Sequence, residues 1–156
     1  MFRAVLMASL LAMPLAGCNS TAERNYSFAL PGAASTDTLG VVNAARRSGK
    51  RSALRIDRSA QRAAERHARD MANARRMAHE LPGGPRFGKR MQRDGIRTRA
   101  AENIARGQRD VGAAVTAWMN SAGHRRNLLD KGFGGVGIAS AKGADGRLYW
   151  AMVLVP

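Results

Sequence analysis

One stretch of the chain, residues 100–129, limits the possible fold more than any other. It opens with a short apolar run, Ala101–Ala105, that contains Glu102 and that Gly107 ends. This pattern is typical of a half-buried strand or a strand-like turn. Burying an unpaired carboxylate is unfavourable. The sequence therefore predicts that Glu102 is bound by another polar side chain.

Two helices are predicted in the rest of this stretch. After Asp110, which is a good helix N-cap, apolar residues recur on one helix face: Val111, Val115, Trp118 and Met119. This helix should end near residues 121–123. Ser121 can then cap a second, shorter helix, with His124 in its first turn. Leu128 and Leu129 should lie on the inner side of that helix, so packed elements would hold both Glu102 and His124.

Three segments, taken in order, resemble a known family. The first is Ala-Glu-Asn-Ile-Ala from Ala101. The second is Trp-Met-Asn-Ser-Ala-Gly-His-Arg-Arg-Asn-Leu-Leu from Trp118. The third is the closing part of the chain, which contains Gly-Val-Gly-Ile and then Tyr-Trp. They resemble the CAP superfamily (cysteine-rich secretory, antigen 5 and pathogenesis-related proteins; SCP-like domains), and most of all its short bacterial branch. The resemblance covers about residues 38–155 and rests on several motifs in one order. It implies an α+β fold, an α-β-α sandwich with a small antiparallel sheet between helices.

The helices that this fold needs are visible in the pattern. Asp37 or Thr38 can cap a first helix that stops at Ser48–Gly49, and Asp57 can cap a longer one. The inner face of the longer helix is Ala60, Ala64, His67, Ala68 and Met71. We interpret this histidine as a core residue. A short helix over Phe87–Gly95 resembles the one that precedes the Ala-Glu-Asn-Ile-Ala segment in the family.

Two further strands are predicted after residue 129. Phe133–Ile138 is rich in glycine and β-formers, and Arg147–Val155 alternates enough to be its antiparallel partner. A turn at Gly143–Gly146 joins them.

The first 36 residues have a different character, so the domain is assigned to residues 37–156. Residues 1–17 combine a short basic start with an apolar run too short to span a bilayer, which predicts a secretory signal peptide. The run ends in Leu-Ala-Gly before Cys18, the only cysteine, and resembles a lipoprotein lipobox. Cys18 is therefore predicted to carry acyl chains such as palmitate, with residues 18–36 as a flexible tether. The alternative is an ordinary signal with an incidental thiol.

These features predict a protein of the cell envelope, bound to the membrane through its N-terminal lipid. Asn19 follows the cysteine, where an aspartate signals inner-membrane retention in many Gram-negative lipoproteins. The outer membrane, facing the periplasm, is therefore favoured if the envelope is Gram-negative.

The chain is strongly basic. Its formal charge is +15, and it falls to +14 when Arg3 leaves with the signal peptide. Such a field attracts anionic envelope polymers, lipid headgroups or nucleic acid in a salt-sensitive way, although general solubility explains it as well. The densest basic cluster is Arg86, Lys89, Arg90 and Arg93. Aromatic residues are too few for a stacking platform, so no specific nucleic-acid partner is expected. The pattern leaves the oligomeric state open.

The resemblance implies a cavity lined by His79, Glu102, Ser121 and His124. Two imidazoles and a carboxylate are a partial ligand set for zinc, so His79, Glu102 and His124 are a candidate metal site. They could equally act as acid and base around a bound group. Larger family members have a second glutamate where this chain has Ser121. No cofactor is therefore required, and any divalent cation should bind weakly.

No residue is assigned a catalytic role. Ser121 lies three residues before His124, but no nucleophile elbow or third orienting acid accompanies it, so we interpret it as a helix cap. Whether the protein is an enzyme stays open. The favoured function is binding of a small or polymeric envelope ligand in the His/Glu-lined cleft, as family members bind sterols, fatty lipids or glycans. The alternative is a metal-assisted or acid/base hydrolase acting on envelope material.

Overall fold

The computed structural model describes residues 37–156, so the predicted leader, Cys18 and the tether lie outside the described residues. The helices are α1 (Thr38–Ser48), α2 (Arg58–Ala74), α3 (Phe87–Arg93), α4 (Val111–Asn120) and α5 (Ala122–Leu128). The strands are β1 (Arg55–Ile56), β2 (Ala101–Arg106), β3 (Gly135–Lys142) and β4 (Leu148–Val155). None of the described helices is long and apolar enough to cross a membrane.

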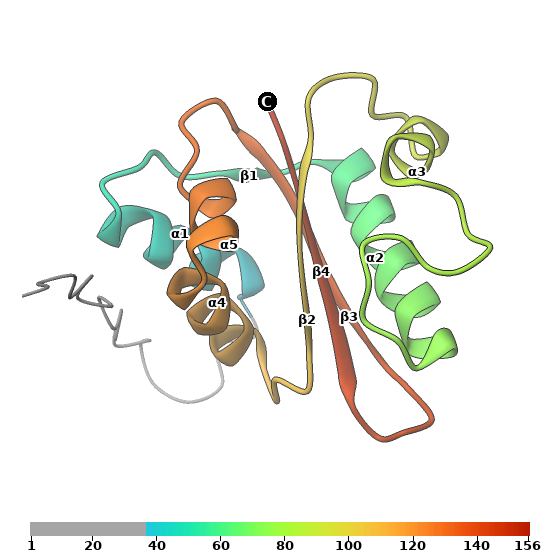
Figure 1. Cartoon of the computed structure of the whole chain (residues 1–156). Helices are drawn as coiled ribbons and strands as arrows, with labels where there is room; N and C mark the ends of the chain where they lie inside the picture. Colours follow the sequence, from blue (N-terminus) through green and yellow to red (C-terminus); the bar gives the residue numbers. More distant parts are fainter. Residues whose placement is uncertain (1–36) are drawn as a thin grey trace, which may run out of the picture.

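The four strands form one sheet in the order β1-β3-β4-β2. As Figure 1 shows, α1, α4 and α5 lie on one side of this sheet and α2 and α3 on the other. The predicted α+β fold and α-β-α sandwich are thus confirmed. The sheet is mixed rather than wholly antiparallel, because β1 pairs parallel with β3 through Arg55 and Ile56. A strand of two exposed residues shows no alternation in the sequence, so this pairing was missed.

The sheet is buried on both faces by two apolar layers. Along β4, alternate residues face opposite layers, as strand geometry requires. Trp150, Met152 and Leu154 belong to the layer under α1, α4 and α5. Tyr149, Ala151 and Val153 belong to the layer under α2 and α3. The nearly continuous apolar sequence of β4 follows from this burial on both sides.

The helix α2 packs very closely on β3. A Cβ atom built on Gly137 would lie 2.1 Å from the backbone carbon of Ala60. Ala60, Ala64 and Ala68 on the inner face of α2 are fully buried, as their spacing predicts. Small side chains on both elements therefore allow the helix backbone to approach the strand.

Three helices are capped by the side chains that the sequence predicts, and α5 is not. Asp37, Asp57 and Asp110 accept hydrogen bonds from backbone N–H groups of α1, α2 and α4, as predicted. Ser121 occupies the N-cap position of α5, but its side chain makes no capping hydrogen bond. Its backbone carbonyl accepts from the Arg125 N–H instead. The prediction that the Ser121 side chain caps this helix is therefore wrong.

Candidate functional site

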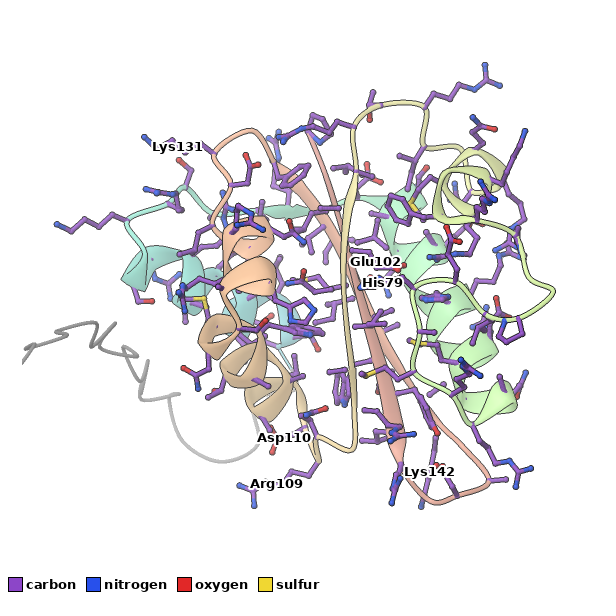
Figure 2. The ribbon with its side chains drawn as sticks, in the orientation of Figure 1. His79, Glu102, Arg109, Asp110, Lys131 and Lys142 are labelled. Carbon is purple, nitrogen blue, oxygen red and sulfur yellow. The ribbon has the colours of Figure 1, made fainter. Side chains whose placement is uncertain are left out.

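The site is built around the carboxylate of Glu102, the second residue of β2. Its side chain is buried and lies between β2 and α2 (Figure 2). Arg90 on α3 binds it with two hydrogen bonds, from Nη1 to Oε2 and from Nη2 to Oε1, both 2.9 Å long. A planar guanidinium matches a carboxylate in this two-bond geometry. The expected partner of Glu102 is thus present, but it is an arginine that sequence analysis placed only in a basic cluster.

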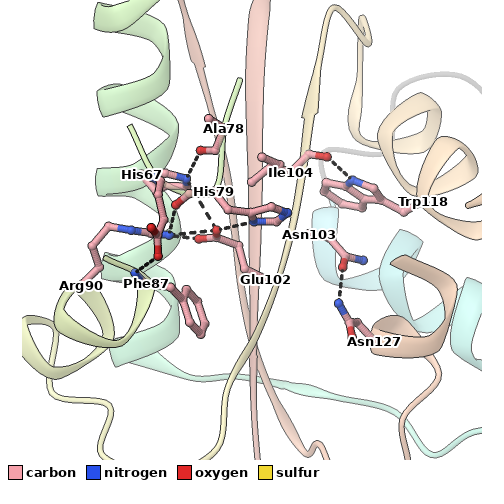
Figure 3. Close-up of polar contacts among 11 residues, drawn as sticks. His67, Ala78, His79, Phe87, Arg90, Glu102, Asn103, Ile104, Trp118 and Asn127 are labelled. Atoms are coloured by element: carbon pink, nitrogen blue, oxygen red, sulfur yellow. Dashed lines mark hydrogen bonds and ion pairs between the residues drawn. The ribbon is translucent and has the colours of Figure 1, made fainter. Parts of the chain in front are cut away.

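His79 is the exposed member of the same network. Its Nδ1 lies 2.9 Å from Glu102 Oε1, and its side chain is 51% exposed. The loop carrying it is fixed by Arg90, whose Nη2 donates to the His79 backbone carbonyl at 2.8 Å. Figure 3 shows the imidazole approaching the Glu102 carboxylate from the side opposite to Arg90. The imidazole of His79 is therefore a second polar partner of Glu102.

The protonation of Glu102 fixes how this histidine is oriented. Burial favours the neutral acid, but the hydrogen bonds from His79 and Arg90 outweigh burial and hold the pKa of Glu102 below its usual value. An ionised carboxylate only accepts hydrogen bonds. His79 Nδ1 must therefore carry the proton that it donates to Glu102. In neutral His79 the other nitrogen, Nε2, is then left as a proton acceptor.

His67 lies on the buried side of the same carboxylate. It is 1% exposed, and its Nε2 is 3.1 Å from the Ala78 carbonyl oxygen and 3.6 Å from Glu102 Oε1. Burial lowers the pKa of His67, and the charge of Glu102 opposes that shift only in part. The core position predicted for His67 is thus correct. Its proximity to Glu102 was missed, although both residues belong to elements predicted to be buried.

His124 lies on the other side of β2. Successive strand residues face opposite ways, so Asn103, next to Glu102, faces α5. Its Nδ2 donates to the His124 carbonyl oxygen at 3.0 Å, and Asn127 Nδ2 donates to Asn103 Oδ1 at 3.0 Å. Burial, and secondly the charge of His79, lowers the pKa of His124. The backbone of His124 is therefore held against β2 by the side chain of Asn103.

Two of the four predicted site residues are in direct contact. His79 Nδ1 lies 2.9 Å from Glu102 Oε1, and His124 is bonded to Asn103 through its backbone carbonyl oxygen. Ser121 is half-buried at the junction of α4 and α5. The predicted cleft lined by all four residues stays a prediction.

The geometry gives no support to the zinc prediction. Within residues 37–156, no group of three or more His, Cys, Asp or Glu side chains is placed to hold a metal ion. Arg90 and His79 already hold the Glu102 carboxylate by three hydrogen bonds, so a cation bound there would lie beside the positive charge of Arg90.

A hollow lies beside this network, on its α2 side. Its volume is about 410 Å³, and its walls are α2, α3 and the loop over residues 81–85. His67 and Arg90 both line it. The hollow is thus in contact with the Glu102 network through these two residues.

The chain matches known bacterial sequences. The model of the cysteine-rich secretory protein family matches residues 39–154. Protein YkwD of Bacillus subtilis strain 168, described as uncharacterized, is 34% identical over 124 residues, which are 76% of this chain and 48% of that protein. The chain therefore spans about half the length of the curated relative that it matches.

Solved structures show the same fold. An extracellular protein of Bacillus anthracis strain Ames that contains an SCP domain has a TM-score of 0.66 and 27% identity, over 85% of this chain and 47% of that one. An outer surface protein of Borrelia burgdorferi also has a TM-score of 0.66, with 20% identity over 74% of this chain and 86% of that one. At such low identity the second likeness concerns the fold alone. With the family match over residues 39–154 and the buried glutamate of the Ala-Glu-Asn-Ile-Ala motif, this chain belongs to the CAP (cysteine-rich secretory protein) family.

Proposed function

We propose that this protein is a lipid-anchored CAP domain of the bacterial envelope that binds a small or polymeric envelope ligand through His79. The observation that carries the proposal is the contrast between an exposed imidazole and the buried groups that hold it. Glu102 and Arg90 are 6% and 3% exposed, whereas the His79 side chain is 51% exposed. A rigid polar group at the surface of a packed scaffold is a common basis of ligand recognition.

The location is part of the same proposal. The matched proteins of B. anthracis and B. burgdorferi are described as extracellular and as an outer surface protein, which supports a place outside the cytoplasm. The leader that ends before Cys18 supports a lipid anchor at that cysteine. If the envelope is Gram-negative, Asn19 favours the outer membrane, facing the periplasm. Anionic envelope polymers suit the basic charge of the domain.

A second candidate function is hydrolysis of envelope material, with His79 as general base. The specific observation in its favour is the Nδ1 contact with Glu102, because a carboxylate that fixes the tautomer leaves Nε2 able to accept a proton. Binding is preferred because no nucleophile was identified in the sequence and the geometry gives no support to a metal that could activate water.

One experiment separates these functions. The wild-type domain, His79→Gln and the control Arg69→Gln are mixed with purified peptidoglycan, and both retention and release of soluble fragments are measured. Arg69 is exposed on α2, so its loss should change little. We expect His79→Gln to weaken retention about tenfold, the effect of losing one hydrogen bond to a charged or strongly polar group.

The two readouts distinguish the candidates. Weaker retention by His79→Gln, without fragment release by any protein, supports binding. Fragment release by the wild type that His79→Gln abolishes supports hydrolysis instead. Unchanged retention and no release in His79→Gln contradict both.

A further inference from the structure

A second hollow lies on α5, apart from the Glu102 network. Its volume is about 520 Å³, and four cationic side chains line it: Arg51, Arg125, Arg126 and Lys131. Figure 2 shows Lys131 at the edge of the domain beside α5, and Lys142 at the opposite end of the molecule. A hollow of this size suits a small ligand or one unit of a polymer.

Backbone carbonyls hold two of these arginines in place. Arg51 Nε donates to the Leu129 carbonyl oxygen, and Arg125 Nη1 donates to the Met119 carbonyl oxygen, both at 2.7 Å. A carbonyl restrains a guanidinium without neutralising its charge. Part of the entropy lost when these long side chains contact a ligand is therefore already lost in the free protein.

The one carboxylate that lines the hollow, that of Asp130, forms its ion pair with an arginine outside the hollow. Arg99 binds both oxygens of Asp130, at 2.9 and 3.2 Å. Hydrogen bonds from Arg99 and from the Gly132 N–H lower the pKa of Asp130 to about 2, so it is ionised at neutral pH. No carboxylate within residues 37–156 forms an ion pair with Arg51, Arg126 or Lys131. The hollow therefore has an excess of positive charge.

The helix α5 separates this hollow from the first site. The residues that α5 and its C-cap give to the hollow recur at the spacing of one helix face: Ala122, Arg125, Arg126 and Leu129. Asn127 lies on another face of α5, where its side chain is bonded to Asn103, and His124 is bonded to Asn103 through its backbone carbonyl oxygen. A change of Arg126 thus leaves the contacts of His79 and Glu102 untouched.

We infer that this hollow binds a phosphorylated sugar or polyol unit of an envelope polymer. Guanidinium and ammonium groups bind phosphate oxygens by charge-assisted hydrogen bonds. Ala122 and Leu129 add an apolar surface on which the carbon face of a sugar or polyol packs. The hollow is open to solvent, so one unit of a long polymer can enter it from the surface. The inference does not depend on the ligand proposed for His79.

The test measures binding of glucose 6-phosphate by calorimetry. The double variant Arg126→Gln/Lys131→Gln is compared with Arg69→Gln/Lys142→Gln, which loses the same charge on exposed parts of α2 and β3. We expect saturable binding to the wild type, about tenfold weaker binding to the first variant and less than a twofold change in the second. Binding should weaken as salt is raised. Glucose should not bind, and His79→Gln should bind like the wild type.

Other outcomes overturn the inference. Equal losses in the two double variants mean that net charge alone attracts the ligand. Inorganic phosphate binding as tightly as glucose 6-phosphate means that the sugar is not recognised. Binding to phosphatidylglycerol vesicles, without binding of glucose 6-phosphate, assigns the surface to the membrane.

Discussion

The carboxylate of Glu102 is contacted from three segments of the chain: α2, the loop that follows it, and α3. Arg90 and His79 donate hydrogen bonds to it, and His67 lies 3.6 Å away. The sequence predicted a polar partner for Glu102, because a carboxylate in an apolar run needs one. It did not predict Arg90, since two residues on separate elements leave no spacing signal. Such pairs depend on how α3 packs on β2.

Loss of Arg90 should destabilise the fold strongly. Arg90→Met keeps most of the side-chain volume but leaves Glu102 buried without the two hydrogen bonds and the positive charge of Arg90. We expect the free energy of unfolding to fall by about 3 to 5 kcal/mol, as when one partner of a buried ion pair is removed. Urea denaturation measures it, with the exposed neighbour Lys89→Met as the control. Similar urea midpoints for the two variants would contradict the role given to Arg90.

Stability should also fall as the solution is acidified. Burial lowers the pKa of His67. As pH falls below 6.5, this imidazole is therefore protonated in the unfolded chain before it is protonated in the folded protein, and unfolding becomes more favourable. The pKa of Glu102 is lowered too, so its contribution is lost below its ordinary value of 4.5. We expect the free energy of unfolding to decrease from pH 7 to pH 5, and less steeply in His67→Gln. Parallel pH profiles of the two proteins are the result that excludes this explanation.

At the scale of the elements, the close packing of α2 on β3 depends on small residues in both. The caps of three helices and both long strands of the closing hairpin were predictable, because each has a local signal in the sequence. The parallel strand β1 was not, since its two residues are defined only by their distant partners Gly135 and Val136. The approach of α2 to Gly137 is likewise a tertiary feature.

Enlarging Gly137 should separate these two elements. In Gly137→Ala the new Cβ meets backbone atoms of Ala60 and Gln61 at 2.1 Å, so the helix must move. We expect a loss of at least about 2 kcal/mol of stability, as in other overpacked cores. In Gly134→Ala, the control, the nearest atom lies at 3.6 Å, an ordinary contact. Thermal unfolding of both variants measures the difference in stability. Equal melting temperatures would show that the packing of α2 on β3 adapts to the added methyl group at little cost.

At the scale of the whole molecule, three ordered motifs were enough to predict the family and the α-β-α sandwich. The motifs lie in residues 101–105 and 118–129 and in the closing hairpin, and they form most of β2, all of α5 and part of the hairpin of β3 and β4. How the site residues are grouped was harder to predict. Glu102 and Asn103 are neighbours in one motif, but strand alternation turns Glu102 towards Arg90 on α3 and Asn103 towards α5.

The proposed anchor is tested on the full-length chain. Cys18→Ala removes the thiol that an acyl chain would occupy, so we expect the variant to leave the membrane fraction or to keep its leader uncleaved. Mass spectrometry and fractionation of the wild type and the variant measure both effects. Cys18→Ser is a second variant with nearly the same shape. An unmodified thiol in wild-type protein that is recovered entirely in soluble form would exclude lipid anchoring.

The proposals for His79 require that its Nδ1 carries the proton and that Nε2 accepts one. Long-range proton–nitrogen NMR spectra of the ¹⁵N-labelled domain report the tautomer of this imidazole directly at a pH where it is neutral. We predict a protonated Nδ1 and a bare Nε2 in the wild type, and loss of this preference in Glu102→Gln, provided that variant remains folded. A wild-type His79 that carries its proton on Nε2 would contradict the geometry on which the proposed binding and base functions both rest.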